Sequence, residues 1–447
     1  RIALPKLDYS DLPTYPKREY WPYEGTDWHY VWKCGNSHRV DSVSHVPHNW
    51  WKDTNYNYRV TRPEIFELTR KGTRATCPML CYSNPKTLQT YIERVDAEIA
   101  GGPKSGVIAP GTKTVAVAQW DANIDCQCEG CKRLYDEKSG RTGNASPIIW
   151  GCFVRQLSDW LAKAHPDYEI SFSPYLNTCD LPEGLTFPAK NAECSLCTMP
   201  GLALLKDEGV RAHEEKLMRD WAAATGRPVR SWDYICWPAE FCSAPYVFGK
   251  VAQDHYRRLR PYTVGSFING TGTPPEKRLF LSAYVWVRSM WNPEFDLDAL
   301  YDTFAARMFA AGAKPMREII RMQEDGWMRP WGSGQISNKN IYEISYPRKD
   351  VLRMQELFAE AKALAKGDAL ALRRIAKYEA CFTDFFKESE DLANGTALEP
   401  TLIQKVASDP AVDGRLDDPA WQAAKAYPFV REMDRERSEP YYPTELR

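Results

Sequence analysis

The stretch TVAVAQW, residues Thr114–Trp120, is the clearest β-strand candidate in the sequence, because β-branched and small apolar residues run through it without a break. A helical pattern over Ile148–Ala164 follows, and Pro166 then stops it. The next apolar run, EISFSPY over Glu169–Tyr175, is again strand-like. Strands that alternate with helical patterns indicate a fold built from repeating βα units.

The same alternation extends over the first 270 residues. The predicted strands are Lys17–Trp21, Asp41–Val46, Met79–Tyr82, Thr114–Trp120, Glu169–Tyr175, Ala192–Leu196, Val229–Ile235 and Thr263–Asn269. Helical patterns between them cover Pro85–Ile99, Ile148–Ala164, Val210–Ala224 and Phe248–Leu259. Strands and helices in this number and length predict an α/β fold, a (β/α)8 TIM barrel. A doubly wound open sheet is the alternative, although no G-x-G-x-x-G follows an early strand.

The pattern becomes entirely helical from Asp298 onward. Apolar residues at helical spacing predict helices over Leu297–Met308, Pro315–Trp327, Asp350–Lys366 and Ala369–Leu392, and Gly367-Asp368 separates the last two. We therefore expect a barrel over residues 1–290, a helical layer packed on it over 291–400, and a tail over 401–447. The tail phrase VDGRLDDPAW resembles the start of a family 9-like carbohydrate-binding β-sandwich, and a polar C-terminal extension is the alternative.

Composition excludes several classes of protein. The 447 residues carry 58 Lys+Arg against 59 Asp+Glu, a balance that gives no sign of a nucleic-acid partner. No apolar run is long enough to insert into a membrane. No G-x-S-x-G elbow or phosphate-binding loop is present either. The aromatic content, 16 Trp and 24 Tyr, fits contacts with flat ligands as well as a large core.

The 13 cysteines include a C-x-C-x-x-C cluster at Cys126, Cys128 and Cys131. Three thiols so close together could ligate structural zinc, with a fourth ligand from Cys34, Cys152 or Cys179. One local disulfide plus a buried free thiol is the alternative. Further pairs are Cys77–Cys81 and Cys194–Cys197. In either case we expect the cluster to fix the shape of a loop.

The chemistry of a (β/α)8 enzyme lies at the carboxyl ends of its strands. Carboxylates there are Asp121, Asp125 and Asp233, with Glu193 and Glu240 as further candidates. The predicted substrate contacts are the aromatic, histidine and amide side chains at the same ends: His45, His48, Trp50, Tyr82, Trp120, Asn123, Tyr175, Trp232, Tyr234, Trp237 and Asn269. Aromatic rings stack on sugar faces, amides bind hydroxyls, and two carboxyl groups cleave glycosidic bonds, so the set predicts a sugar site.

Several stretches together resemble the family catalogued as domain of unknown function 4838. The clearest is VAVAQWDANIDCQCEGCKRL, a strand followed by an Asp and then by the C-x-C-x-x-C cluster. The remaining stretches are an early H-x-x-H-x-W segment, AHPDYEISFSPY, the Cys194 region, SWDY, VGSFIN and YVWVRSMWNPEFD. The resemblance covers roughly Lys17 to Ile320.

That family includes glycoside hydrolase family 163, whose members resemble endo-β-N-acetylglucosaminidases acting on complex N-glycans. The resemblance implies substrate assistance: the 2-acetamido oxygen attacks the anomeric carbon, one carboxyl group orients the acetamide, and another protonates the leaving oxygen. Similar barrels place two neighbouring acidic residues after strand four. This chain instead has Asp121 and, four residues later, Asp125. We expect Asp121 to be catalytic, with Asp125 or Asp233 as the second carboxyl group; Asp233 could also be a buried acceptor of hydrogen bonds.

The sequence therefore predicts a secreted, periplasmic or cell-surface glycoside hydrolase that acts on a glycan or glycoprotein and needs no cofactor. An exo-acting enzyme on an acidic or sulfated sugar is one alternative, for which Arg155, Arg230 and Arg288 could supply a clamp. A non-catalytic glycan-binding barrel is the other. The sequence does not predict the oligomeric state.

Overall fold

The computed structural model describes residues 13–21, 57–74, 79–109, 111–120, 122–138, 145–197, 201–235, 242–269, 275–331, 336–395, 427–428 and 445–446. The chain divides into two compact units, Arg1–Ser389 and Glu390–Arg447. Within the second unit, β7 (Tyr427–Pro428) and β8 (Glu445–Leu446) form a short antiparallel pair.

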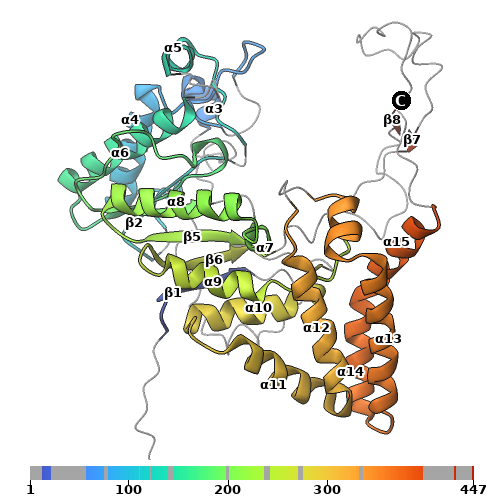
Figure 1. Ribbon diagram of the computed structural model, residues 1–447. Helices are drawn as coiled ribbons and strands as arrows, with labels where there is room; N and C mark the ends of the chain where they lie inside the picture. Colours follow the sequence, from blue (N-terminus) through green and yellow to red (C-terminus); the bar gives the residue numbers. More distant parts are fainter. Residues whose placement is uncertain are drawn as a thin grey trace, which may run out of the picture. The chain divides into compact units, whose positions relative to one another are not determined.

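A six-stranded parallel sheet forms the centre of the first unit, in the order β1-β6-β5-β4-β3-β2 (Figure 1). Its strands are β1 (Lys17–Trp21), β2 (Thr114–Ala118), β3 (Glu169–Ser173), β4 (Ala192–Cys197), β5 (Val229–Tyr234) and β6 (Thr263–Asn269). Each lies where the sequence predicts a strand. The α/β class with a parallel sheet is therefore confirmed.

The first strand lies beside the last, which requires a close approach of two backbones. Gly265 in β6 is paired with Lys17 in β1 and has φ +141°, a conformation that favours glycine. A Cβ atom at Gly265 would lie 1.7 Å from the carbonyl oxygen of Lys17. Glycine is therefore needed for β1 to lie at this edge of the sheet.

The predicted strand at Met79–Tyr82 is not part of this sheet. Leu80 forms an isolated antiparallel bridge with Phe66, and the Cys81 N–H donates to the Ile65 carbonyl at 2.8 Å. The segment thus pairs locally with the chain around Phe66, and it turns at Tyr82 before the helix that begins at Pro85. The other predicted strand between β1 and β2, Asp41–Val46, lies outside the described residues.

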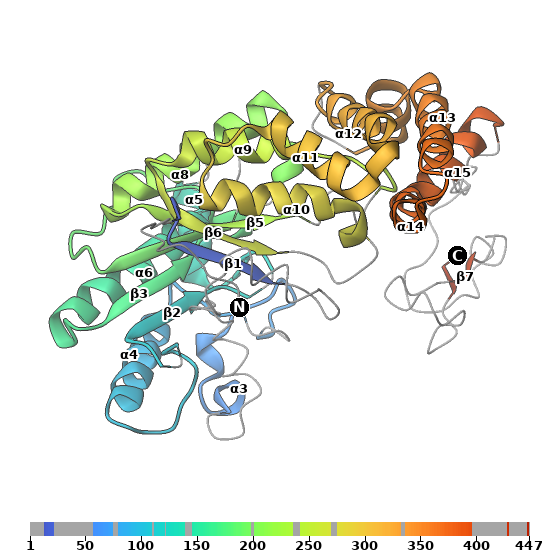
Figure 2. The same ribbon diagram turned by 90° about the horizontal axis from the view of Figure 1, so that it is seen from below.

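Helices connect the strands and cover the sheet. Those before β6 are α3 (Tyr58–Thr61), α4 (Pro85–Ile99), α5 (Glu129–Lys138), α6 (Ser146–Ala164), α7 (Gly201–Leu204), α8 (Glu208–Thr225) and α9 (Gly249–Leu259), with single 3-10 turns η1 (Pro63–Ile65) and η2 (Leu176–Thr178). Figure 2 shows α9 and α10 (Pro275–Trp291) side by side along the sheet near β5 and β6. A helix starts at Pro85 because Asn84 caps it, accepting the Lys86 N–H at 3.0 Å.

Further helices follow α10. They are α11 (Leu297–Phe309), α12 (Ala313–Trp327), α13 (Arg348–Leu364), α14 (Ala369–Glu379) and α15 (Thr383–Ala393), with short turns η3 (Ala310–Gly312) and η5 (Ala380–Phe382) and a π-helical segment η4 (Lys339–Ser345). The single helix predicted over Ala369–Leu392 is wrong, because η5 divides it into α14 and α15. Phe382, in this turn, is buried against Phe358 of α13 with ring centroids 5.0 Å apart. Tertiary packing breaks a helix that the apolar pattern alone continues.

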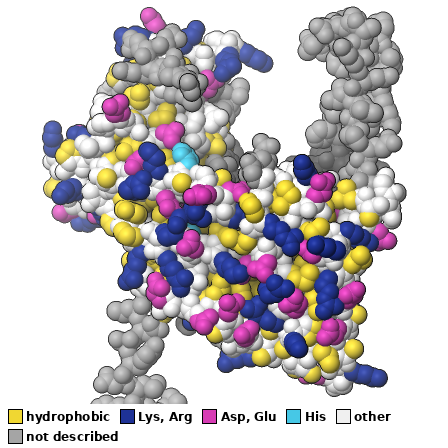
Figure 3. Space-filling model, in the orientation of Figure 1, with side chains coloured by type: hydrophobic (Ala, Val, Ile, Leu, Met, Phe, Trp, Pro, Cys, Tyr) yellow, Lys and Arg dark blue, Asp and Glu magenta, His cyan; other side chains and the backbone are white. Residues whose placement is uncertain are grey.

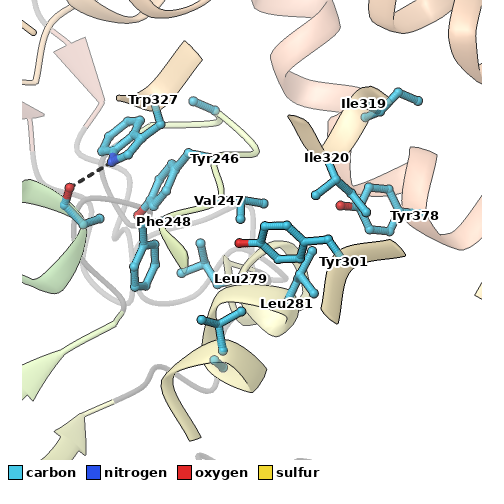
Figure 4. Close-up of a cluster of buried hydrophobic side chains, with 14 of the residues drawn as sticks. Tyr246, Val247, Phe248, Leu279, Leu281, Tyr301, Ile319, Ile320, Trp327 and Tyr378 are labelled. Carbon is cyan, nitrogen blue, oxygen red and sulfur yellow. Dashed lines mark hydrogen bonds between the residues drawn. The ribbon is translucent and has the colours of Figure 1, made fainter. Parts of the chain in front are cut away.

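Two hydrophobic clusters form the core of the first unit. One joins β2, β3 and β4 to α4, α6 and α8. The other runs from Ile268 of β6 through α9 and α10 into α11–α15, so the helical layer shares one core with the sheet. Figure 4 shows its centre, where Tyr246 stacks on Trp327 with ring centroids 4.0 Å apart and the Trp327 indole donates to the Ala203 carbonyl.

On the face shown in Figure 3, basic and acidic side chains are interspersed over the helical region. Arg317 of α12, for example, contacts both Asp298 and Asp302 of α11. Among the described residues, no helix combines the length and apolarity that a membrane span requires.

Candidate functional site

The segments that follow β2 and β3 meet at the carboxyl edge of the sheet. Gln119, directly after β2, is buried, and its amide oxygen accepts the Thr178 hydroxyl at 2.8 Å. Its amide nitrogen donates to the Ala122 carbonyl at 3.0 Å. Gln119 therefore shapes the turn on either side of Asp121, although Asp121 itself lies outside the described residues.

Asn177, in η2, holds the next part of the same loop. Its side-chain oxygen accepts the Ile124 N–H at 3.1 Å, and its nitrogen donates to the Ile124 carbonyl at 2.9 Å. Ser146, the first residue of α6, donates to that carbonyl as well, at 3.0 Å. The loop after β2 is thus fixed by polar side chains from two other elements.

Aromatic side chains gather on one face of the neighbouring strands. Trp232 and Tyr234 of β5 form a small cluster with Cys197 of β4 and Tyr175 after β3, which we call the strand-end cluster. The Cys197 thiol and the Tyr234 hydroxyl are 3.5 Å apart. Burial raises the pKa of Tyr234, so its phenol stays neutral and can donate a hydrogen bond. Tyr175 and Trp232 are both partly exposed.

Two polar atoms of these strands are buried without a partner. The indole N–H of Trp232 has no hydrogen-bond partner among the described residues, and neither has the hydroxyl of Ser171 in β3. Buried polar groups normally form hydrogen bonds, so an orphaned donor needs an explanation, and a bound polar ligand or water supplies one. Hence the strand-end cluster pairs an apolar surface with an N–H group that is free to bind such a molecule.

Asp233 lies on the opposite face of β5 from Trp232 and Tyr234. Its carboxylate is buried and accepts hydrogen bonds from the hydroxyls of Ser231 at 2.9 Å, Tyr256 at 2.5 Å and Ser266. Tyr256 belongs to α9, so Asp233 faces the helices. These contacts favour the structural role over the predicted catalytic one.

Asp233 also belongs to a buried group with Glu214 of α8 and His255 of α9, whose ligand atoms all lie within 4.8 Å of one another. The His255 and Glu214 side chains approach to 3.8 Å. Carboxylate and imidazole groups can hold a divalent cation, but Asp233 already accepts hydrogen bonds from hydroxyls. We therefore interpret this group as a polar network between the sheet and its helices.

Asp125 lies on the loop after β2 and is partly exposed. One carboxylate oxygen accepts the Arg70 guanidinium at 2.9 Å and the other accepts the Gln127 amide at 2.9 Å. Its backbone N–H donates to Glu67 at 3.1 Å. Burial, with the nearby Cys126 thiol as the second cause, raises the pKa of Glu67 to about 8.

Four cysteine thiols lie together beside this loop. Cys81 follows the bridge at Leu80, Cys126 and Cys128 precede α5, and Cys131 lies in the first turn of α5. The four sulfur atoms lie within 4.8 Å of one another. Hydrogen bonds from the thiols of Cys126 and Cys131 lower the pKa of Cys81 to about 4. The residues predicted as metal ligands are thus brought together with a fourth thiol.

Cys81 is not among the fourth ligands that the sequence predicts. Cys152 is exposed on α6, Cys179 follows η2, and neither belongs to the group; Cys34 lies outside the described residues. The only signal for Cys81 in the sequence is its spacing from Cys77, which does not connect it to a cluster so much further along the chain.

The remaining predicted contacts divide into three groups. Tyr82 is buried against Trp150 and Phe153, which favours a core role over a substrate contact. Asn123 is exposed and Trp120 partly exposed, both after β2. Asn269 ends β6, with no description of its side chain. Outside the described residues are His45, His48, Trp50, Asp121, Trp237 and Glu240.

The arginines and Glu193 lie away from the strand ends. Glu193 is near the start of β4 and pairs with Lys17 at 2.5 Å. Arg155 pairs with Asp159 within α6, and Arg288 of α10 lies over the Phe295 ring. Arg230 is buried within β5. These positions do not favour an arginine clamp at the strand ends.

The chain belongs to the family described as domain of unknown function DUF4838, which matches residues 1–321. No curated protein matches it. Two solved structures are remotely similar. One, a structure of CpGH84B, has 11% identity and a TM-score of 0.30, with 86% of this chain and 71% of that chain covered.

The other solved structure is that of a GH138 enzyme targeting pectin rhamnogalacturonan II. It has 11% identity and a TM-score of 0.31, and the match covers 86% of this chain and 59% of that chain. Likenesses this remote say nothing by themselves about the activity of the present chain.

Proposed function

We propose that the protein is a glycoside hydrolase that cleaves a β-linked N-acetylhexosamine within a complex glycan. The observation that carries the proposal is the strand-end cluster, because it combines the Tyr175, Trp232 and Tyr234 rings with an unpartnered indole N–H. Aromatic faces stack on the C–H faces of sugars, while a free N–H donates to a hydroxyl or an acetamide oxygen. The amides of Asn123 and, in sequence, Asn269 follow neighbouring strands.

The sheet supports the further proposal of a closed (β/α)8 barrel. Lys17 of β1 and Glu193 of β4 are separated by β6 and β5, so in a flat sheet their backbones would be about 14 Å apart. Their side chains nevertheless meet at 2.5 Å, which requires the sheet to curl. Two further strands, drawn from residues 22–113, would close it between β1 and β2.

In the proposed reaction the 2-acetamido oxygen of the substrate attacks the anomeric carbon, and the bond to the leaving oxygen breaks as that oxygen is protonated. Water then opens the cyclic intermediate, and the net configuration is retained. Asp121 is the first catalytic candidate, since it follows β2 directly. Asp125 takes the second role, because Asp233 faces the helices while Asp125 is partly exposed on the same loop.

A digestion panel of complex N-glycans and glycoproteins, read by mass spectrometry, tests this function. Endo-cleavage predicts the release of oligosaccharides by the wild-type chain, with turnover lost in Asp121→Asn. Asp167→Asn is the matched control, because Asp167 is exposed before the start of β3 and pairs with Lys113 there. Release of monosaccharides alone would replace endo- by exo-action, and tight glycan binding without any cleavage would establish a non-catalytic barrel instead.

The location outside the cytoplasm, the division into barrel, helical layer and tail, and the tail's resemblance to a carbohydrate-binding module stay predictions. Each fits an enzyme that degrades glycans, and none is needed for the assignment of the strand-end cluster.

A further inference from the structure

The four-cysteine group offers a site that the proposed glycosidase chemistry does not use. It draws its thiols from two parts of the chain: Cys81 precedes α4, while Cys126, Cys128 and Cys131 bracket the start of α5. Three of the four are fully buried and Cys128 is partly exposed. Nothing in the proposed reaction needs a thiol, so the group requires another explanation.

The sulfur positions match a tetrahedral metal site. Zinc–sulfur bonds of about 2.3 Å place the corners of a tetrahedron about 3.8 Å apart. The Cys81 sulfur lies 3.6 Å from that of Cys128 and 3.9 Å from that of Cys131. Disulfide partners would be bonded at about 2.0 Å. All four cysteines are free, so the geometry fits shared coordination better than pairing.

Neighbouring groups are placed as the outer partners of thiolate ligands. The Leu68 N–H points to the Cys126 sulfur at 3.3 Å, and the Ser83 hydroxyl lies 2.8 Å from the Cys131 sulfur. Donors of this kind orient metal-bound thiolates and stabilise their charge. A cluster assembled only by packing apolar thiols would not need them.

We propose that Cys81, Cys126, Cys128 and Cys131 bind one structural zinc ion. Four sulfur ligands leave no open position, so the site is structural and not catalytic. The ion connects the segment before α4 to the loop between β2 and α5, which in sequence also carries Asp121 and Asp125. The thiols release their protons on binding, so affinity falls as the pH is lowered.

Metal analysis of the purified full chain tests the proposal. Mass spectrometry of metals is expected to give close to one zinc per chain in the wild type and in the control Cys152→Ser, whose thiol is exposed on α6. Cys81→Ser and Cys131→Ser are expected to lose most of it. Wild-type chain without metal after purification and after dialysis against zinc would overturn the proposal, as would two disulfides found by thiol titration of the denatured chain.

Cobalt substitution keeps the test decisive if the variants fail to fold. The wild-type chain, stripped by chelator and reloaded with Co²⁺, should show the intense visible bands of tetrahedral cobalt and the near-ultraviolet band of thiolate-to-cobalt charge transfer. Absence of the charge-transfer band would contradict thiolate coordination. Stoichiometric iron in place of zinc would retain the four ligands but overturn the choice of metal. None of these readouts depends on glycosidase activity.

Discussion

Asp233 and Trp232 are neighbours in the sequence, yet their side chains lie on opposite faces of β5. Side chains alternate along a strand, so Trp232 and Tyr234 share one face and Asp233 takes the other. The alternation was available from the sequence, and it already shows that Trp232, Asp233 and Tyr234 cannot all reach one sugar. Which face meets the helices depends on Tyr256 and Ser266, whose positions only the fold supplies.

Asp233→Asn should destabilise the protein by about 2–4 kcal/mol, because an amide replaces a buried carboxylate that accepts hydrogen bonds from hydroxyls. Urea unfolding measures the change. Asp254→Asn, at an exposed position on α9, is the control and should shift stability by less than about 0.5 kcal/mol. Unaltered stability with lost turnover in Asp233→Asn would instead make Asp233 catalytic.

Glu324 of α12 predicts a dependence of stability on pH. Burial raises its pKa above 4.5, although the Lys250 N–H in the first turn of α9 and the Tyr301 hydroxyl both donate to its carboxylate. A raised pKa in the folded state makes the group's contribution full at low pH and lost as the pH rises through that pKa. Glu324→Gln should therefore gain stability relative to wild type as the pH goes from about 5 to about 8.

Thermal unfolding of both chains across that pH range measures the trend. Glu318→Gln is the control with the opposite sign, because the Arg321 hydrogen bond lowers the pKa of Glu318. Its wild-type contribution is present at neutral pH and is lost on acidification. A difference between Glu324→Gln and wild type that does not change with pH would contradict the account of the buried carboxylate.

Among the elements, the strands and most helices follow from local pattern, since α4 and the six strands of the sheet begin within a residue or two of their predicted positions. What the pattern missed depends on distant contacts. Met79–Tyr82 has the residues of a strand, but its backbone pairs with the chain near Phe66. Cys81 joins the other three thiols only because that pairing brings it beside the loop after β2.

Gly265→Ala tests how β1 is held against β6. The added methyl would overlap the Lys17 carbonyl, so we expect a loss of more than about 3 kcal/mol, or failure to fold. Gly367→Ala is the control: it also has positive φ, +99°, but a Cβ there meets nothing within 4 Å. Strain alone should cost it about 1–2 kcal/mol. Equal losses in the two variants, measured by urea unfolding, would show that the β1–β6 approach is not tight.

For the whole molecule, the two hydrophobic clusters explain why the sheet and the helices α11–α15 form one unit. In the described residues, neither cluster extends beyond Phe386. The Lys17–Glu193 pair likewise joins strands that are far apart in sequence. Contacts of this range could not be predicted from residue spacing, and they decide how strongly the sheet curls.

A chain shortened to residues 1–395 should therefore keep the melting temperature of the full chain. Calorimetry of both forms measures this, with cleavage of the same glycan as a second readout. A large fall in melting temperature would show that the unit Glu390–Arg447 contributes to the core of the first.

The central claim is that the carboxyl edge of the parallel sheet binds and cleaves a glycan. The most direct measurement is a crystal structure of the Asp121→Asn chain with an N-glycan that contains the chitobiose core. The account predicts a sugar ring against Trp232 and Tyr234, with a polar atom on the Trp232 indole and the scissile oxygen beside residue 121. A glycan bound elsewhere, with the strand-end cluster unoccupied, would contradict it.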